Sequence, residues 1–462
     1  MSQSGENRIA YGIVLPGVMR RILGLELRRS AAIGTALVLL VIGALLLYFA
    51  EGIYFETGWM QLAMTQRLYL VILWPLALAA GAWQARREQR NPVGELFDST
   101  PRPRAQRVMP TLGAMGIAVV GGYLAMGLAG AAWIIGTARY FPVAAVVVTA
   151  VGAFALVAAV WLGMAAGRLL PSPVTAPILA VAGLALLLLL PMLTKPRGWL
   201  ALVFSPMAEM NMPDAYATVP HRASAAQALW LAGLAVAAVL LLVAGTRKLR
   251  LAALLPVALA AALAIAVMPH DKRVVYNAMD PVARELVCAP GEPRLCLSRV
   301  HSGLLSEAAP RAREALTVLA TLPGLPQRVH EDTTTVLPER LPEWKPDTAL
   351  VRIELGDDGH LRTRTVDMVA AAFAGPPGCD NYADLAQGLA AASWMLGTEP
   401  TAVESGDIFS SDTSYVADAV TLWKGLNEVP AEEARARVTA LHQAATSCSD
   451  TEGLLTRDAG KP

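Results

Sequence analysis

The feature that most limits the fold of this chain is a set of long stretches without a single Asp, Glu, Lys or Arg. Seven of them are long enough to consider as membrane spans, for which a helix needs about 20 residues. They run over residues 31–50, 68–84, 108–138, 140–167, 169–194, 223–246 and 251–269. Lipid offers no water to peptide groups, so a span has to pair its own backbone, as a helix does. The sequence therefore predicts an α-helical polytopic membrane protein with about seven transmembrane helices.

Arg and Lys residues are unequally distributed between these stretches. With a cytoplasmic N-terminus, the inside segments carry fourteen such residues near the ends of the stretches, and the short outside segments carry five. The inside set is Arg20, Arg21, Arg28, Arg29, Arg86, Arg87, Arg90, Arg102, Arg104, Arg107, Arg168, Arg247, Lys248 and Arg250, and the outside set is Arg67, Arg139, Lys195, Arg197 and Arg222. Positive residues favour the cytoplasmic side. The pattern predicts a multi-pass protein of a bacterial cell membrane, with its N-terminus inside and everything after Pro269 outside.

Three regions follow from this topology. Residues 1–30 are Arg-rich, with no small-residue cleavage site after the first apolar run, and are expected to form a cytoplasmic amphipathic segment. Residues 31–269 form the transmembrane domain, and residues 270–462 have the composition of a soluble domain. The net charge of +1 gives no reason to expect nucleic acid as a partner. The lipid bilayer is the expected surrounding.

All four cysteines, Cys288, Cys296, Cys379 and Cys448, lie in the C-terminal region. An even number confined to one compartment indicates two disulfides in an oxidising space. Three pairings are open. Cys288 and Cys296 flank a Pro/Gly turn signal, which favours a local hairpin bridge and leaves Cys379 for Cys448.

The C-terminal region is expected to be a small α+β domain. Charged and apolar residues alternate at helical spacing over 309–321, 382–396, 414–426 and 431–445, while 351–355 and 361–366 flank an Asp-Asp-Gly turn and predict a hairpin. The Pro-rich stretch 322–347 has no clear pattern.

No catalytic or metal-binding signature is present. The chain lacks a phosphate-binding GxxxxGK[ST] loop, an HExxH pair and a GxSxG elbow. His301, His330 and His360 have no ligand spacing and are read as solvated or hydrogen-bonded surface histidines. The apolar stretches contain no ionisable residue, which disfavours ion-coupled transport and intramembrane hydrolysis. Any transport would take its energy from a partner.

The cytoplasmic loop after the second span is the candidate partner site. Residues 93–100 lie between prolines and can form a short helix that presents Glu95, Leu96 and Phe97 to a groove of a soluble subunit. Alternatively, the loop is only a basic segment that fixes topology. Gly163 and Gly167 form a GxxxG pair that predicts close helix packing, within the chain or in a dimer.

The sequence from Ala85 to Glu88, followed by residues 95–104, resembles the coupling loop of ABC-2-type transporter permeases, and residues 18–30 resemble their cytoplasmic connecting helix. The resemblance implies a permease subunit without its own ATP site, and an exporter is the expected class of transporter. It also implies that Glu88, Glu95, Leu96, Phe97 and Arg102 contact an ABC ATPase subunit that uses ATP, while this chain binds no cofactor itself. A homodimer or a second permease would complete the path. Most of that family has six spans, so a seventh span and an external domain are departures.

A second expectation comes from a different class. The chain would then be a membrane-anchored sensor or an envelope assembly factor whose external domain binds a ligand or partner. Seven spans exceed what an anchor needs, and we therefore place the permease first.

Overall fold

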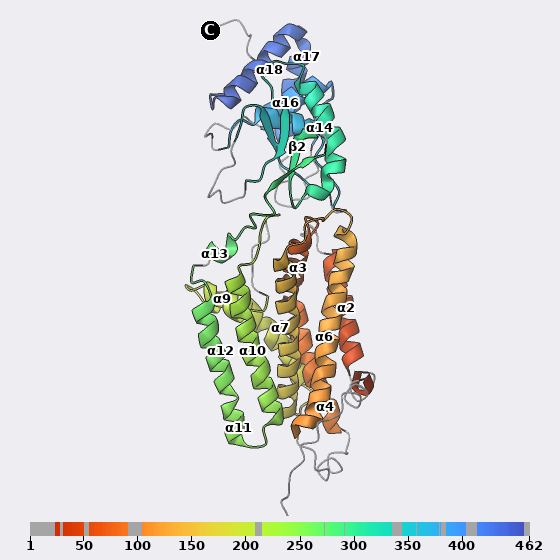
Figure 1. Cartoon of the computed structure of the whole chain (residues 1–462), viewed down its shortest axis with the longest axis vertical. Coiled ribbons are helices and arrows are strands. Elements are labelled where there is room, and N and C mark those ends of the chain that lie inside the picture. Colours follow the sequence, from red (N-terminus) through yellow and green to blue (C-terminus); the bar gives the residue numbers. More distant parts are fainter. Residues whose placement is uncertain are drawn as a thin grey trace, which may run out of the picture.

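The structure is a computed structural model. It describes residues 24–27, 31–49, 55–90, 104–207, 215–271, 273–290, 292–334, 344–356, 358–377, 379, 385–402 and 414–456. A bundle of long helices carries a smaller mixed domain at one end (Figure 1). The C-terminal domain thus lies beyond the ends of the helices and not along their sides.

The bundle is built from the chain up to Tyr276. Its long helices are α2 (Ala32–Phe49), α4 (Leu70–Arg90), α6 (Arg104–Ile134), α7 (Val143–Leu169), α8 (Thr175–Leu193), α10 (His221–Val243) and α12 (Leu254–Val267), with shorter α3 (Trp59–Leu68), α9 (Trp199–Phe204), α11 (Arg247–Ala252) and α13 (Arg273–Tyr276). Runs of Ala, Leu and Val with few breakers explain these helices.

Six helices in the described residues are long and apolar enough to cross a membrane, with α11 and α12 counted together. The pair α3 and α4 is bent by 52° at Tyr69 and makes a seventh if it forms one span. The expected helical class is confirmed, and each of the seven predicted stretches overlaps one of the long helices, although the stretches 108–138, 140–167 and 169–194 extend several residues beyond them. The N-terminal segment 1–30 is described only at residues 24–27, which are helical.

Helix α7 lies at the centre of the bundle and packs most closely on α4. A Cβ atom at Gly163 would lie 2.0 Å from the backbone oxygen of Leu78, and one at Gly81 would lie 2.1 Å from that of Val160. Gly167 lies similarly against Ala82. The predicted GxxxG pair therefore brings two helices of the same chain into backbone contact.

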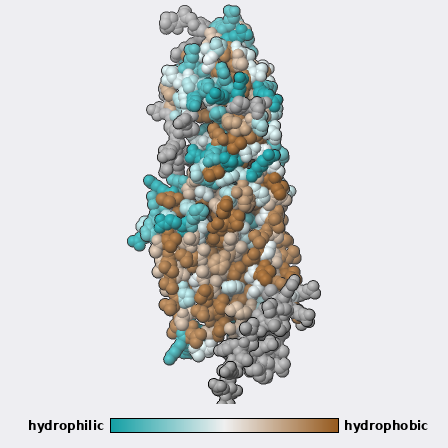
Figure 2. Space-filling view, in the orientation of Figure 1, coloured by the Kyte–Doolittle hydropathy of each residue, from teal (hydrophilic) through white to brown (hydrophobic). Residues whose placement is uncertain are grey.

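The face of the bundle that Figure 2 shows is mostly apolar between its two ends. Leu128, Val181 and Leu255 are 71%, 70% and 72% exposed. Hydrophilic residues concentrate on the C-terminal domain and at the far tip of the bundle, where α11 carries Arg247, Lys248 and Arg250. Such a wide exposed apolar band is unusual for a protein surrounded by water.

The C-terminal domain has a four-stranded sheet in the order β1 (Leu286–Ala289), β2 (Glu292–Ser298), β3 (Arg328–Glu331) and β4 (Thr348–Val351). Strands β1 and β2 are antiparallel, and β2, β3 and β4 are parallel. Helix α14 (Leu305–Leu319) connects β2 to β3 and buries Ala308, Ala312, Ala315 and Leu319, the stripe of an amphipathic helix. Helices α15 (Thr365–Ala370), α16 (Leu385–Leu396), α17 (Ser414–Glu428) and α18 (Ala431–Thr446) complete the domain.

The predicted cysteine pairing is present. Cys288 and Cys296 are bonded across β1 and β2, and Cys379 is bonded to Cys448 just beyond α18. The four predicted helices of the domain are also found, each within a few residues of its expected bounds.

The predicted hairpin over 351–366 forms only next to its turn. Leu355 and Leu361 make an antiparallel bridge, and the backbone N–H of Arg362 donates to the backbone oxygen of Glu354, but the described residues there form no longer ladder and α15 begins at Thr365. Strand β4 instead pairs with β3, which lies in the Pro-rich stretch that had no clear pattern. The parallel pairing is long-range, so no local turn signal reveals it.

Candidate functional site

The predicted docking loop falls largely outside the described residues. This holds for Glu95, Leu96, Phe97 and Arg102, and for the side chain of Glu88. The flanking ends of α4 and α6 are described, and they lie at the end of the bundle away from the C-terminal domain (Figure 1).

The structure corrects the predicted placement of Arg67. The sequence places it in a short outside loop, whereas the structure places it inside α3 with only 3% of its surface exposed. Arg67 directly precedes the charge-free stretch 68–84, so the sequence pattern excludes it from the predicted helix. The helix continues through Arg67 because backbone and amide oxygens of neighbouring segments accept its hydrogen bonds.

The guanidinium of Arg67 connects three segments of the bundle. Its Nε and Nη2 donate to the backbone oxygen of Pro206 at 3.1 and 2.9 Å, and Nη2 also donates to Oε1 of Gln227 on α10 at 3.0 Å. Gln227 passes the connection on, since its Nε2 donates to the backbone oxygen of Leu202 in α9 at 2.9 Å. The adjacent Gln66 donates to the backbone oxygen of Tyr123 in α6 at 3.3 Å. The bend between α3 and α4 is thereby tied to α6, α9 and α10.

Part of this cluster has no hydrogen-bond partner. Nη1 of Arg67 and the hydroxyl of Tyr123 are both buried and unpartnered. They lie together beside Gly152 of α7, where a Cβ atom would be 2.4 Å from the Tyr123 hydroxyl and 2.8 Å from Cδ of Arg67. Gly152 is nine residues into α7, about 14 Å from its nearer end at 1.5 Å per residue. A positive charge thus sits well inside the bundle.

This cluster can hold a charge but is unsuited to moving protons. A guanidinium stays protonated in proteins, so it serves as a fixed donor and not as an acid or base. In the part of the chain that the structure describes, no carboxylate forms an ion pair with Arg67. We regard the Arg67 cluster as one candidate functional feature of the bundle.

A second cluster joins the bundle to the C-terminal domain. Tyr216, just before α10, donates its hydroxyl to Oε1 of Glu331 at the end of β3, and His301 Nδ1 lies 2.6 Å from the same oxygen. The other carboxylate oxygen accepts the backbone N–H of Ser298 at 2.6 Å. Burial alone would raise the pKa of Glu331, but the charge of His301 and these hydrogen bonds hold the pKa below its ordinary value.

The residue types Ser298, His301 and Glu331 also occur in hydrolase triads, but their geometry differs. Ser298 Oγ and Glu331 both approach Nδ1 of His301, while Nε2 faces no partner. A nucleophile has to lie on the opposite nitrogen from the acid. All three side chains are buried as well, with exposures of 0, 4 and 3%. The cluster is therefore a structural joint.

The histidine interpretation is correct in part. His360 is an exposed residue paired with Glu307, and His330 is partly buried. His301 is hydrogen-bonded but buried, unlike the predicted surface residue. Its burial comes from docking against Tyr216, a contact between distant parts of the sequence. No group of metal-ligating side chains is found among the described residues.

Other contacts hold the C-terminal domain on the bundle. Tyr140, between α6 and α7, donates to Asp280 at 2.7 Å, and burial together with that hydrogen bond raises the pKa of Tyr140 to about 12. Gly303 lies against the connection after α6, since a Cβ atom there would be 1.8 Å from the backbone oxygen of Thr137. The two parts are thus closely fitted at several points.

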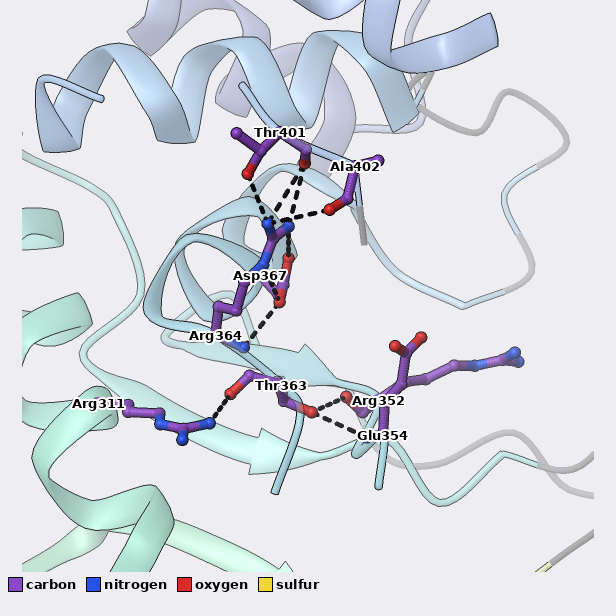
Figure 3. Close-up of polar contacts among 8 residues, drawn as sticks. All are labelled: Arg311, Arg352, Glu354, Thr363, Arg364, Asp367, Thr401 and Ala402. Atoms are coloured by element: carbon purple, nitrogen blue, oxygen red, sulfur yellow. Dashed lines mark hydrogen bonds and ion pairs between the residues drawn. The ribbon is translucent and has the colours of Figure 1, made fainter. Parts of the chain in front are cut away.

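A third polar network lies within the C-terminal domain (Figure 3). Arg364, at the start of α15, bonds Asp367 and reaches Thr401 and the backbone oxygen of Ala402. Arg311 of α14 donates to the backbone oxygen of Thr363 from the other side. Both guanidinium groups donate to acceptors within the domain, and these hydrogen bonds fix the start of α15. Arg364 is therefore not available to bind an external anion.

Comparison of the chain with protein-family models, with curated proteins and with solved structures finds no match.

Proposed function

We propose that this protein is the membrane-spanning permease subunit of an ATP-driven transporter, with its C-terminal domain outside the cell membrane. The observation that carries the proposal is the separation of two chemically different ends. The end of α4 and the start of α6 lie at one end of the bundle, and the disulfide-bonded domain lies at the other (Figure 1).

The distribution of charge supports this orientation. Arg168 of α7 and the basic helix α11 lie at the end away from the C-terminal domain, and Arg168 donates to the backbone oxygen of Leu242 there. Positive residues favour the cytoplasmic side, and disulfides favour the oxidising side. The two independent signals therefore support the same orientation.

The scarcity of acidic side chains in the bundle helices supports a separate ATPase subunit as the source of energy. Apart from Glu88 near the end of α4, the bundle helices contain no Asp or Glu. Arg67 is buried among them, but a fixed guanidinium cannot shuttle a proton. Proton coupling through the bundle is therefore disfavoured, and energy supplied at the α4–α6 connection by an ATP-hydrolysing partner is the simpler mechanism.

Co-purification tests the proposal directly. We expect a tagged full-length chain to retain a nucleotide-binding subunit, and the variant Glu95→Ala/Phe97→Ala to lose it. The matched control is Glu285→Ala in the C-terminal domain, which should retain the subunit. Failure of the tagged chain to bring down any nucleotide-binding subunit from its own membranes would reject the proposal.

The second candidate is a membrane-anchored sensor or envelope assembly factor. The joint formed by Tyr216 and Glu331 favours it in one respect, because a ligand on the C-terminal domain would act on a segment that leads into α10. That reading predicts that Glu95→Ala/Phe97→Ala leaves function intact, while Tyr216→Phe uncouples an external stimulus from the bundle.

A further inference from the structure

A pocket of about 190 Å³ lies at a corner of the bundle that neither candidate site uses. It is enclosed by the end of α8, the turn after it, α9 and α13. Its polar lining residues include Lys195, Ser205 and Tyr276, and Leu202 and Met207 form part of its apolar wall. The corner is close to the C-terminal domain, where Figure 1 labels α9 and α13.

The pocket presents one cation and one unused hydroxyl. Lys195 is exposed at its edge. Ser205 is 4% exposed, and its Oγ has no hydrogen-bond partner. A buried hydroxyl without a partner costs free energy, so a ligand oxygen that accepts its proton would be favoured. The two groups together suit an anionic oxygen ligand.

A second positive charge adjoins the wall of the pocket. Pro206 follows Ser205 and precedes Met207, both of which line the pocket. The backbone oxygen of Pro206 accepts two hydrogen bonds from Arg67, at 3.1 and 2.9 Å. The guanidinium therefore lies directly behind this wall. With no carboxylate paired to it among the described residues, its charge adds to that of Lys195.

The surroundings of the pocket indicate which anion would reach it. Met192 and Leu193 are the last two residues of α8 before the turn, and they are 65% and 70% exposed on the apolar band. On the other side, Trp199 stacks on His270 with ring centroids 4.4 Å apart. Trp is typical of the boundary between the apolar core of a bilayer and its headgroups. The pocket thus opens where apolar and hydrophilic surfaces meet.

We propose that this pocket binds the phosphate group of an anionic phospholipid. This inference relies on the bundle spanning a membrane, as proposed above. The Lys195 ammonium pairs with the phosphate, the Ser205 hydroxyl donates to a phosphate oxygen, and the acyl chains lie on the exposed apolar residues of α8. A soluble phosphate would use the same polar groups but would gain nothing from Met192 and Leu193.

Native mass spectrometry of the full-length chain in neutral detergent tests the assignment. The probes are phosphatidylglycerol, phosphatidylcholine and inorganic phosphate. We expect retention of phosphatidylglycerol over phosphatidylcholine, and about tenfold weaker binding for Lys195→Gln, as loss of about 1.4 kcal/mol would give. Ser205→Ala removes one hydrogen bond and should weaken binding about fivefold. Arg197→Gln is the matched control, because it removes a charge two residues away that does not line the pocket.

The outcomes separate the possible sources of phosphate. Inorganic phosphate that binds in a Lys195-dependent way, with no preference for phosphatidylglycerol, would overturn the lipid assignment. Equal effects of Lys195→Gln and Arg197→Gln would overturn the pocket altogether. No ATPase subunit takes part in the measurement, so failure here would leave the proposed permease function standing. Failure of co-purification would likewise leave a lipid result intact.

Discussion

The hydroxyl of Tyr216 donates to the carboxylate of Glu331, which lies 115 residues further along the chain. Tyr216 belongs to the segment that leads into α10 of the bundle, and Glu331 ends β3 of the C-terminal domain. The carboxylate also accepts from Ser298 and contacts His301. This buried acid is therefore one of the contacts that hold the two parts of the protein together, beside the hydrogen bond from Tyr140 to Asp280.

Glu331→Gln is expected to loosen this joint. The amide carries no charge for His301 and has only one acceptor oxygen for Tyr216 and Ser298, so the cost should be about 3 kcal/mol. Hydrogen exchange in the full chain should accelerate over residues 292–298. Glu285→Gln is the matched control, because its ion pair with Arg299 is exposed and worth less than about 1 kcal/mol. Equal exchange in the two variants would contradict the joint.

The same carboxyl group predicts a loss of stability in acid. Its pKa in the folded protein lies below the ordinary value of 4.5, so the stabilisation is full above that value. As the pH falls through the folded pKa, the group takes up a proton and the stabilisation is lost. Thermal unfolding of the wild type should therefore shift downward below about pH 4.5 by more than that of Glu331→Gln. Parallel pH profiles would assign the acid sensitivity to other groups.

The two disulfides are expected to differ in their contribution. Cys379 and Cys448 are separated by 69 residues, and Cys288 and Cys296 by 8. A longer closed loop restricts the unfolded chain more, which gives about 4.4 kcal/mol against about 2.5 kcal/mol in the chain-entropy model. Calorimetry of the two double-serine variants should show the larger loss for Cys379→Ser/Cys448→Ser. The reverse order would show that strain or residual unfolded structure dominates.

Local patterns predicted much of this fold. The charge-free stretches identify the long helices because a span has to exclude charge throughout. The cysteine pairing follows from a turn signal between Cys288 and Cys296. The sequence pattern did not predict strand β3. Its partners β2 and β4 are parallel strands, connected to it through α14 and through a long loop, and such pairing leaves no local signal.

Arg67 was the main residue that sequence reasoning placed wrongly. A usable signal was present, because Gln61, Thr65, Gln66 and Arg67 all fall within one short helix. Adjacent residues of a helix point to different sides, so these polar side chains face several neighbouring segments, where buried polar groups need hydrogen-bond partners. Gln227, a lone amide in an apolar stretch, supplies one of them. The contact itself joins residues 160 positions apart and is set only by packing of the helices.

Gly163→Ala tests the backbone contact of α4 and α7. The added methyl group would lie 2.0 Å from the backbone oxygen of Leu78, so the helices have to separate. Overpacking of this kind costs about 1–3 kcal/mol. Gly121→Ala is the control, because nothing lies within 4 Å of its added atom. Thermal unfolding in detergent should be lower for Gly163→Ala, and equal values would contradict the close approach.

A double-mutant cycle on Arg67 and Gln227 tests the buried cluster of the bundle. Arg67→Met leaves the backbone oxygen of Pro206 without its donor, and Gln227→Leu removes one acceptor of the guanidinium. Each change alone should lower the unfolding temperature. The double variant should lose about 1 kcal/mol less than the sum of the two single losses, because the second change no longer leaves a buried group without its partner.

Arg222→Met is the control, because this exposed change at the start of α10 should have little effect on stability. Strict additivity would mean that the two side chains do not interact. Non-additivity of the expected size would show that Arg67 on α3 and Gln227 on α10 stabilise each other across the bundle.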